Sequence, residues 1–166
     1  MGRSNDNIAL YRSVEEHLGF LVEFLRRLVE AESPSDDKAA VDACGRIAEE
    51  LARQVGCKVK RHRQRGFGDG LELRWGTVPK RSDGRGRILL LGHLDTVWPL
   101  GTLATMPWRE SKGKIYGPGV LDMKAGVAMA LKALRVLREI GVTRPVTLLL
   151  NSEEEIGSPF SRAITE

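Results

Sequence analysis

Cysteine and histidine are scarce in this chain of 166 residues, which contains two and three of them respectively. Cys44 and Cys57 cannot form a disulfide framework, and neither has a cysteine or histidine at metal-type spacing, so we expect buried free thiols. No apolar run approaches the roughly 18–20 residues that span a membrane. The first residues contain no apolar segment of the signal-peptide kind. We therefore expect a cytoplasmic protein without membrane contact.

Aromatic residues are also few, at 5% of the chain, and this bears on its most basic segment. The net charge of +4 arises mainly between Arg53 and Arg87, and we call the cationic residues of this segment the basic stripe. They are Arg53, Lys58, Lys60, Arg61, Arg63, Arg65, Arg74, Lys80, Arg81, Arg85 and Arg87. The stripe lacks the regularly interleaved aromatics on which nucleic-acid bases stack. We expect a solvated strand face and no nucleic acid, and an anion- or nucleic-acid-binding protein is the alternative.

Hydrophobic periodicity predicts both helices and strands. The expected helices are 13–32, 35–56, 123–140 and one that begins at 158. The expected half-buried strands are 57–60 and 71–75, and the expected central strands are 88–91 and 146–150. A strand, a helix and a strand follow one another in the second half of the chain, which indicates a parallel crossover. We therefore expect one domain of the α/β class.

Residues of types that commonly bind metals follow the first expected central strand. His93 comes directly after an apolar run and a glycine, at the carboxyl end of the strand, where open α/β sheets collect their reactive groups. Asp95 lies two residues further on, within reach of the same ring. A carboxylate that accepts the second N–H of a metal-bound imidazole fixes its tautomer. A lone loop histidine is the alternative interpretation.

Carboxylates stand at two further boundaries between elements. Asp122 follows a Gly-Pro-Gly turn and precedes the helix 123–140, so it is either an N-cap or a carboxylate that can bridge two cations. Glu153, Glu154 and Glu155 follow the second central strand. Adjacent carboxylates repel one another, and either a cation or full solvation relieves that repulsion. Both interpretations stay open for each group taken alone.

Taken together, the three groups carry a family resemblance. The matching segments are 91–97 (LGHLDTV), 116–126 (YGPGVLDMKAG) and 151–158 (NSEEEIGS). They resemble the co-catalytic zinc metallopeptidase and aminoacylase family, which includes glutamate carboxypeptidases, acetylornithine deacetylases and succinyl-diaminopimelate desuccinylases. Residues 98–102 and 108–113 look most like the glutamate carboxypeptidase branch. The family usually has aspartate where this chain has Glu153.

The resemblance implies a fold and a set of roles. It implies a zinc-peptidase-like, three-layer α/β/α fold with a mostly parallel central sheet. His93 would bind one zinc ion, Asp122 would bridge both, and Glu155 would bind the other. Glu154 would be the general base and acid, and Asp95 would orient His93. The peptide bond between Asp122 and Met123 would be cis. The cofactor would be Zn2+, two ions per complete site, with Co2+ or Mn2+ as substitutes.

The resemblance also implies what the chain would do and what it would lack. The substrate would be a small peptide or an N-acyl amino acid, and the reaction would be hydrolysis of an amide bond. Residues 1–166 would be the N-terminal part of the catalytic domain, without the lid or dimerisation domain and the remaining metal ligands. We therefore expect weak zinc binding and little hydrolysis from this chain alone. A homodimer of the full-length protein and a non-catalytic binding module both stay open.

Overall fold

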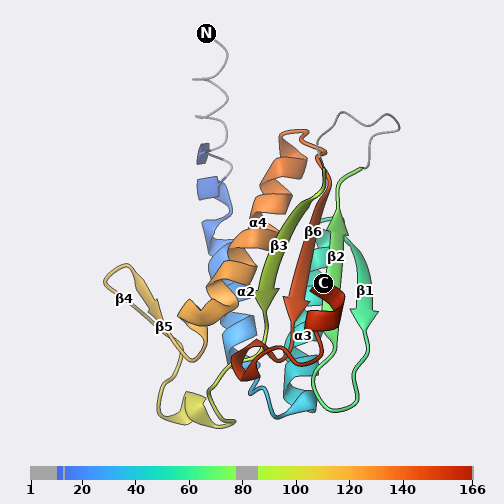
Figure 1. The fold of residues 1–166 in the computed structure, drawn as a ribbon. Helices are drawn as coiled ribbons and strands as arrows, with labels where there is room; N and C mark the ends of the chain where they lie inside the picture. The colour runs from blue at the N-terminus through green and yellow to red at the C-terminus, as the bar shows by residue number, and fades with distance from the viewer. Residues whose placement is uncertain (1–10, 13, 78–85, 166) are drawn as a thin grey trace.

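The computed structural model describes residues 11–12, 14–77 and 86–165, and its centre is a four-stranded sheet (Figure 1). The strands lie in the order β1-β2-β6-β3. Their bounds are Lys58–His62 for β1, Gly70–Trp75 for β2, Ile88–His93 for β3 and Val146–Asn151 for β6. A separate hairpin joins β4 (Arg109–Ser111) to β5 (Lys114–Tyr116), in a segment for which the sequence predicts only a loop.

Three helices pack on one face of this sheet. They are α2 (Leu18–Glu30), α3 (Lys38–Gln54) and α4 (Ala125–Glu139). Asp37 caps α3 by accepting a hydrogen bond from the Ala40 N–H at 2.9 Å. The core lies between the helices and the apolar side chains of β2 and β6, which include Leu71, Leu73 and Leu150. The helices and strands predicted from periodicity are therefore confirmed in kind, but the predicted helix starts differ. Helix α2 begins at Leu18, α3 at Lys38, α4 at Ala125 and the last described helix at Arg162. Residue 13 lies outside the described residues.

The α/β class is confirmed, but the mostly parallel sheet is wrong for this chain. Strand β2 pairs antiparallel with both β1 and β6, and only β3 and β6 run parallel. The physical reason is the connection: β1 and β2 follow one another through a short turn, which favours antiparallel pairing. Strands β3 and β6 are joined through α4, as the predicted crossover requires.

The second face of the sheet is largely open in the described residues. The described residues form two of the three expected layers. On the second face only the short α5 (Arg162–Thr165) lies beside the described strands (Figure 1). The prediction that residues 88–91 form a strand covered on both faces is wrong here, because β3 is an edge strand. Leu89 and Leu91 are 54% and 56% exposed.

Two further expectations concern the thiols and the membrane. Cys44 and Cys57 are both buried and free, as predicted. Burial raises the pKa of the Cys57 thiol to about 11, so this thiol stays protonated and unreactive near neutral pH. No helix among the described residues is long and apolar enough to cross a membrane.

Candidate metal centre

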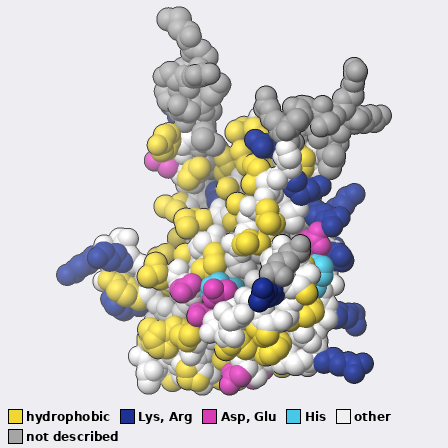
Figure 2. Space-filling model, viewed as in Figure 1, with side chains coloured by type: hydrophobic (Ala, Val, Ile, Leu, Met, Phe, Trp, Pro, Cys, Tyr) yellow, Lys and Arg dark blue, Asp and Glu magenta, His cyan; other side chains and the backbone are white. Residues whose placement is uncertain are grey.

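Three segments that are distant in the sequence meet below the carboxyl ends of β3 and β6. His93 is the last residue of β3, and Glu154 and Glu155 lie in a short 3-10 helix (Glu154–Ile156) that follows β6. Asp122 lies in a turn (Val120–Lys124) that leads into α4. Figure 2 shows acidic side chains grouped beside a histidine at this end of the sheet.

His93, Asp122 and Glu155 each direct one ligand atom toward the same point. These three atoms all lie within 4.8 Å of one another. The Nε2 atom of His93 is 3.1 Å from Asp122 Oδ1 and 3.8 Å from Glu154 Oε2. An imidazole with two carboxylates is a donor set that suits a zinc ion, so the residues present fit the expected cofactor.

The other nitrogen of the His93 ring is held by Asp95. Its Nδ1 is 3.0 Å from the Asp95 backbone carbonyl and 3.4 Å from the carboxylate oxygen Oδ1. A carbonyl oxygen only accepts hydrogen bonds, so Nδ1 must be the nitrogen that carries the proton in the neutral ring. The Nε2 lone pair is then the one that faces Asp122 and Glu155, as a metal ligand requires.

The Asp95 carboxylate also fixes the segment that carries the two glutamates. It is fully buried and accepts hydrogen bonds from the backbone N–H groups of Glu154 and Glu155, each at 3.1 Å. It accepts a third, at 2.6 Å, from the hydroxyl of Ser35. Sequence reasoning missed Ser35, because no local pattern connects it to a carboxylate 60 residues away. One buried carboxylate therefore joins three segments behind the candidate ligands.

The charges of this cluster shift its pKa values. Burial alone lowers the pKa of His93, but the hydrogen bonds and charges of Asp95 and Asp122 outweigh burial and raise that pKa to about 9. Burial raises the pKa of Asp95, but its hydrogen bonds to His93, Ser35 and two backbone N–H groups outweigh burial and lower it. Burial, together with the neighbouring carboxylates, raises the pKa of Glu155. Without a cation, a proton on His93 partly neutralises the acidic group.

The turn that carries Asp122 has unusual backbone geometry. The Asp122-Met123 peptide bond is cis, as the resemblance predicts, and Gly119 before it has a left-handed φ of 68°. A side chain at Gly119 would meet Thr96 at 2.5 Å, so glycine is required here on two grounds. The Asp122 side chain is 74% exposed and is open to a ligand.

The three consecutive glutamates have different surroundings. Glu153 is fully buried and accepts hydrogen bonds from the Ser152 hydroxyl at 2.7 Å and from the Ser161 N–H at 2.7 Å. It therefore closes the loop that follows β6 and does not face the cluster. Glu154 is half exposed, and its carboxylate lies beside the His93 ring. The resemblance assigns roles to Glu154 and Glu155, and the fold adds that Glu153 is buried.

Two hollows flank the cluster. One, of about 400 Å³, is lined by residues that include Leu91, Met123 and Glu154. The other, of about 320 Å³, includes Val97 and Glu155 among its lining residues. Glu154 therefore borders one recess and Glu155 the other.

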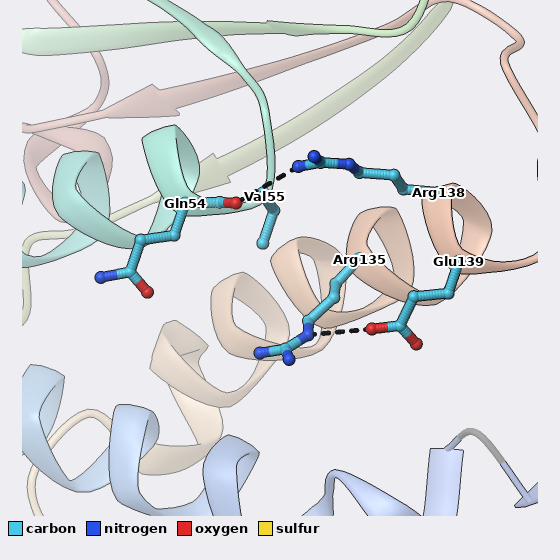
Figure 3. A pocket seen from close by; sticks show the side chains of 5 residues that line it. All are labelled: Gln54, Val55, Arg135, Arg138 and Glu139. Carbon is cyan, nitrogen blue, oxygen red and sulfur yellow. Dashed lines mark hydrogen bonds and ion pairs between the residues drawn. The ribbon is translucent and has the colours of Figure 1, made fainter.

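A third hollow, of about 510 Å³, lies at the C-terminal ends of α3 and α4 and contains no group of the cluster (Figure 3). Its charged groups already have partners. Arg135 donates to Glu139 at 3.1 Å, and Arg138 donates to the backbone carbonyl of Gln54 at 3.4 Å. Nothing in this hollow indicates a ligand.

Four of the eight stripe residues that the structure describes pair with carboxylates. Glu49 pairs with both Arg53 and Arg61, and Glu72 pairs with Arg74 and with Lys60. These pairs favour the expected solvated face over a site for anions. Three stripe residues, Lys80, Arg81 and Arg85, lie outside the described residues.

The described residues thus form an α/β sheet with a histidine and two carboxylates gathered near the carboxyl ends of its two parallel strands. In comparison with known sequences, residues 89–166 match the peptidase family M20/M25/M40. The resemblance seen in the three motifs is confirmed, and this part of the chain is similar to that family.

Individual relatives extend the match over the whole chain. Carboxypeptidase G2 of a Pseudomonas species is 32% identical over 170 residues, which cover 100% of this chain and 40% of that protein. Acetylornithine deacetylase of Proteus mirabilis is 39% identical over 82 residues, which cover 48% of this chain and 21% of that protein. The chain thus spans about two fifths of the length of the carboxypeptidase.

Solved structures share the fold. Human carnosine dipeptidase 1 matches with a TM-score of 0.78 and 18% identity, over 93% of this chain and 36% of that one. Aminopeptidase PepT of Bacillus cereus matches with a TM-score of 0.69 and 25% identity, over 86% of this chain and 38% of that one. Both matches cover only the smaller part of the longer protein.

Proposed function

We propose that this chain forms part of a zinc-dependent hydrolase of amide bonds. In this proposal His93 and Glu155 would each hold one zinc ion, and Asp122 would serve both. The observation that carries it is the convergence of these three side chains, from three separate segments, to within 4.8 Å. A solvated acidic turn or an N-cap, taken alone, gives no reason for that convergence.

The residues around the ligands would carry the proton transfers. Zinc ions, when bound, supply Lewis acidity toward a carbonyl group and toward water. Glu154 would accept the proton of the attacking water and return it to the leaving amine, because its carboxylate lies beside the ligands without being one of them. Asp95 would keep the His93 ring in the tautomer and orientation that ligation needs.

The proposed substrate is a small peptide or an N-acyl amino acid. Two hollows of modest volume on either side of the cluster fit a short molecule that is cleaved near its middle. The names of the relatives support this class, since they are a carboxypeptidase, a deacetylase and a dipeptidase. The narrower assignment to a glutamate carboxypeptidase rests on the branch resemblance and on the similarity to carboxypeptidase G2.

The greater length of the relatives bears on the activity expected of this chain alone. The relatives are more than twice as long as this chain, so we propose that residues 1–166 correspond to the N-terminal part of a catalytic domain. Zinc binding by this part is then weak, and hydrolysis needs the remainder. Reading the gene beyond the codon for residue 166 tests this part of the proposal.

Zinc titration of the 166-residue chain tests the metal centre. His93→Ala and Asp122→Asn should each abolish saturable binding, whereas Glu154→Gln should leave it unchanged. In a longer protein that contains the chain, Glu154→Gln should abolish turnover of N-acyl amino acids and dipeptides without loss of zinc. Unaltered zinc binding by both ligand variants would refute the site, and retained turnover in Glu154→Gln would remove Glu154 from its role.

A further inference from the structure

Lys124 is a buried lysine that the proposed chemistry does not use. It lies two residues after Asp122 and is 1% exposed. Its ammonium group donates a hydrogen bond of 2.8 Å to the backbone carbonyl of Leu28, near the C-terminal end of α2. Burying an ammonium group costs several kcal/mol unless the protein supplies compensating partners. A methionine of similar length would fill the same space without that cost, so packing alone does not explain the charge.

The end of α2 offers a partner suited to a cation. The Glu32 N–H would normally continue the helical ladder to the Leu28 carbonyl, but it bonds to the Val29 carbonyl instead. The Leu28 carbonyl is therefore one of the unpaired acceptors at a helix C-terminus, where the helix dipole favours positive charge. Lys124 and the more distant Cys44 thiol, at 3.8 Å, both donate to it.

The side chain of Asp122 has few hydrogen bonds of its own that could fix the turn. Among the described residues, the Asp122 carboxylate has one hydrogen-bond partner, and that partner is the candidate ligand His93. The turn is closed from within by the Lys124 N–H, which donates to the Gly119 carbonyl at 3.0 Å. The Lys124 side chain then connects the turn to a helix that lies outside it.

The residues that follow α2 also hydrogen-bond to the segment after His93. The segment that follows the helix runs beside residues 94–96: the Ser33 hydroxyl donates to the Leu94 carbonyl at 2.7 Å, and the Thr96 N–H donates to the Ser33 carbonyl at 2.8 Å. Ser35 reaches the Asp95 carboxylate. The α2 C-terminus and the residues after it are therefore one platform behind both the imidazole and the Asp122 turn.

We infer that Lys124 is a positioning residue, whose buried ammonium group ties the Asp122 turn to the α2 platform and thereby sets the position of the Asp122 carboxylate relative to His93. This inference rests on the proposed metal site for its functional consequence. The tie itself is a property of the metal-free chain and can be measured without any metal.

The test compares two substitutions that each remove a buried ammonium group. Lys124→Met removes the tie. Lys132→Met is the matched control, because Lys132 is 6% exposed, lies two turns further along α4, and has no hydrogen-bond partner for its Nζ among the described residues. Zinc affinity is measured by calorimetric titration of the complete 166-residue chain. Lys124→Met should bind zinc about 10–100-fold more weakly, the loss typical of groups that support metal ligands, and Lys132→Met should stay within about twofold of the parent.

Amide hydrogen exchange of the metal-free proteins gives the second readout. Lys124→Met should speed exchange at the amides of positions 124 and 125, which close the turn, while Lys132→Met should leave them protected. If Lys124→Met does not fold, Lys124→Gln, which keeps a donor and loses the charge, is measured in its place and should show the same two effects.

The outcomes separate the inference from the proposed function. Accelerated exchange together with weakened zinc binding supports the tie and its role. Unchanged exchange at the turn overturns the tie, whatever happens to stability. Accelerated exchange with unchanged zinc affinity overturns the positioning role and leaves Lys124 a structural residue. Absence of zinc binding by the parent chain refutes the proposed metal site and with it the functional half of this inference, whereas the exchange data still decide the structural half.

Discussion

Raising the pH should strengthen zinc binding at the candidate centre, because His93 must lose a proton before it can bind a metal. The pKa of His93 is raised to about 9 in the metal-free protein. At pH 7 only about 1% of the ring is then neutral, and apparent affinity is about 100-fold weaker than for the deprotonated site. Affinity should rise about tenfold per pH unit, which corresponds to about 1.4 kcal/mol, and level off above about pH 9.

Calorimetric titration with zinc between about pH 6 and about pH 8 measures this slope. Titrations at one pH in two buffers of different ionisation enthalpy count the protons released, and the expected count near pH 7 is about one. His62→Asn is a suitable control, since His62 pairs with Glu72 at 3.0 Å outside the cluster and its loss should not alter the slope.

Asp95→Asn should lower the pKa of His93 and flatten the slope, because the charge that stabilises the imidazolium is removed. An affinity that stays constant over this pH range in the parent chain, with no proton released, would refute the reasoning. It would mean either that the imidazole is already neutral or that His93 is not a ligand.

Four substitutions test the hydrogen bonds and packing of the fold, each by urea unfolding of the metal-free chain. Asp95→Asn should destabilise the fold by about 3 kcal/mol, because the asparagine amide leaves a buried backbone N–H donor without an acceptor. Ser35→Ala should cost about 1–2 kcal/mol, because alanine removes the hydrogen bond to the Asp95 carboxylate. Folding lowers the pKa of Asp95, so this carboxylate stabilises the fold only while it is ionised. The difference in unfolding free energy between the parent and Asp95→Asn should therefore shrink as the pH falls below about 4. A difference that stays constant would contradict this. Asp37→Ala should cost about 1 kcal/mol through loss of the α3 cap, and an unchanged midpoint would show that the cap contributes nothing. Gly68→Ala should cost about 1–3 kcal/mol, because its added carbon would lie 2.4 Å from Val41, and unaltered stability would mean that the neighbouring chain yields freely.

Much of the fold could be predicted because its elements have clear periodicity. The run 146–150 becomes β6, and the helical spacing after Met123 becomes α4, which connects two parallel strands as the crossover rule requires. The place of β3 could not be predicted in the same way. A continuous apolar run looks the same in the sequence whether its strand takes a central or an edge position in the sheet. The position depends on which strands pair with it.

The candidate ligands could be proposed from the sequence because each follows a recognisable boundary of an element. Their supports could not, because the contacts are long-range. The bond from Ser35 to Asp95 spans 60 residues, and the bond from Lys124 to the α2 end spans 96. Lysine is rarely buried, so Lys124 gave no sign of its environment. Glu153 illustrates the same limit, since it has the same chemistry as its two neighbours and the opposite burial.

The three ligand segments differ in how they can be altered. Asp95 hydrogen-bonds both to the ring of His93 and to the backbone of Glu154 and Glu155. A change in either of these two segments therefore disturbs the other. The aspartate turn has its own attachment to α2 and shares no hydrogen bond with Asp95 among the described residues. In the proposed site, changes to the ligand spacing, and hence a preference for a smaller or larger ion, should therefore begin at residues 119–125. There the Asp122 ligand can be moved while His93 and Glu155 keep their alignment.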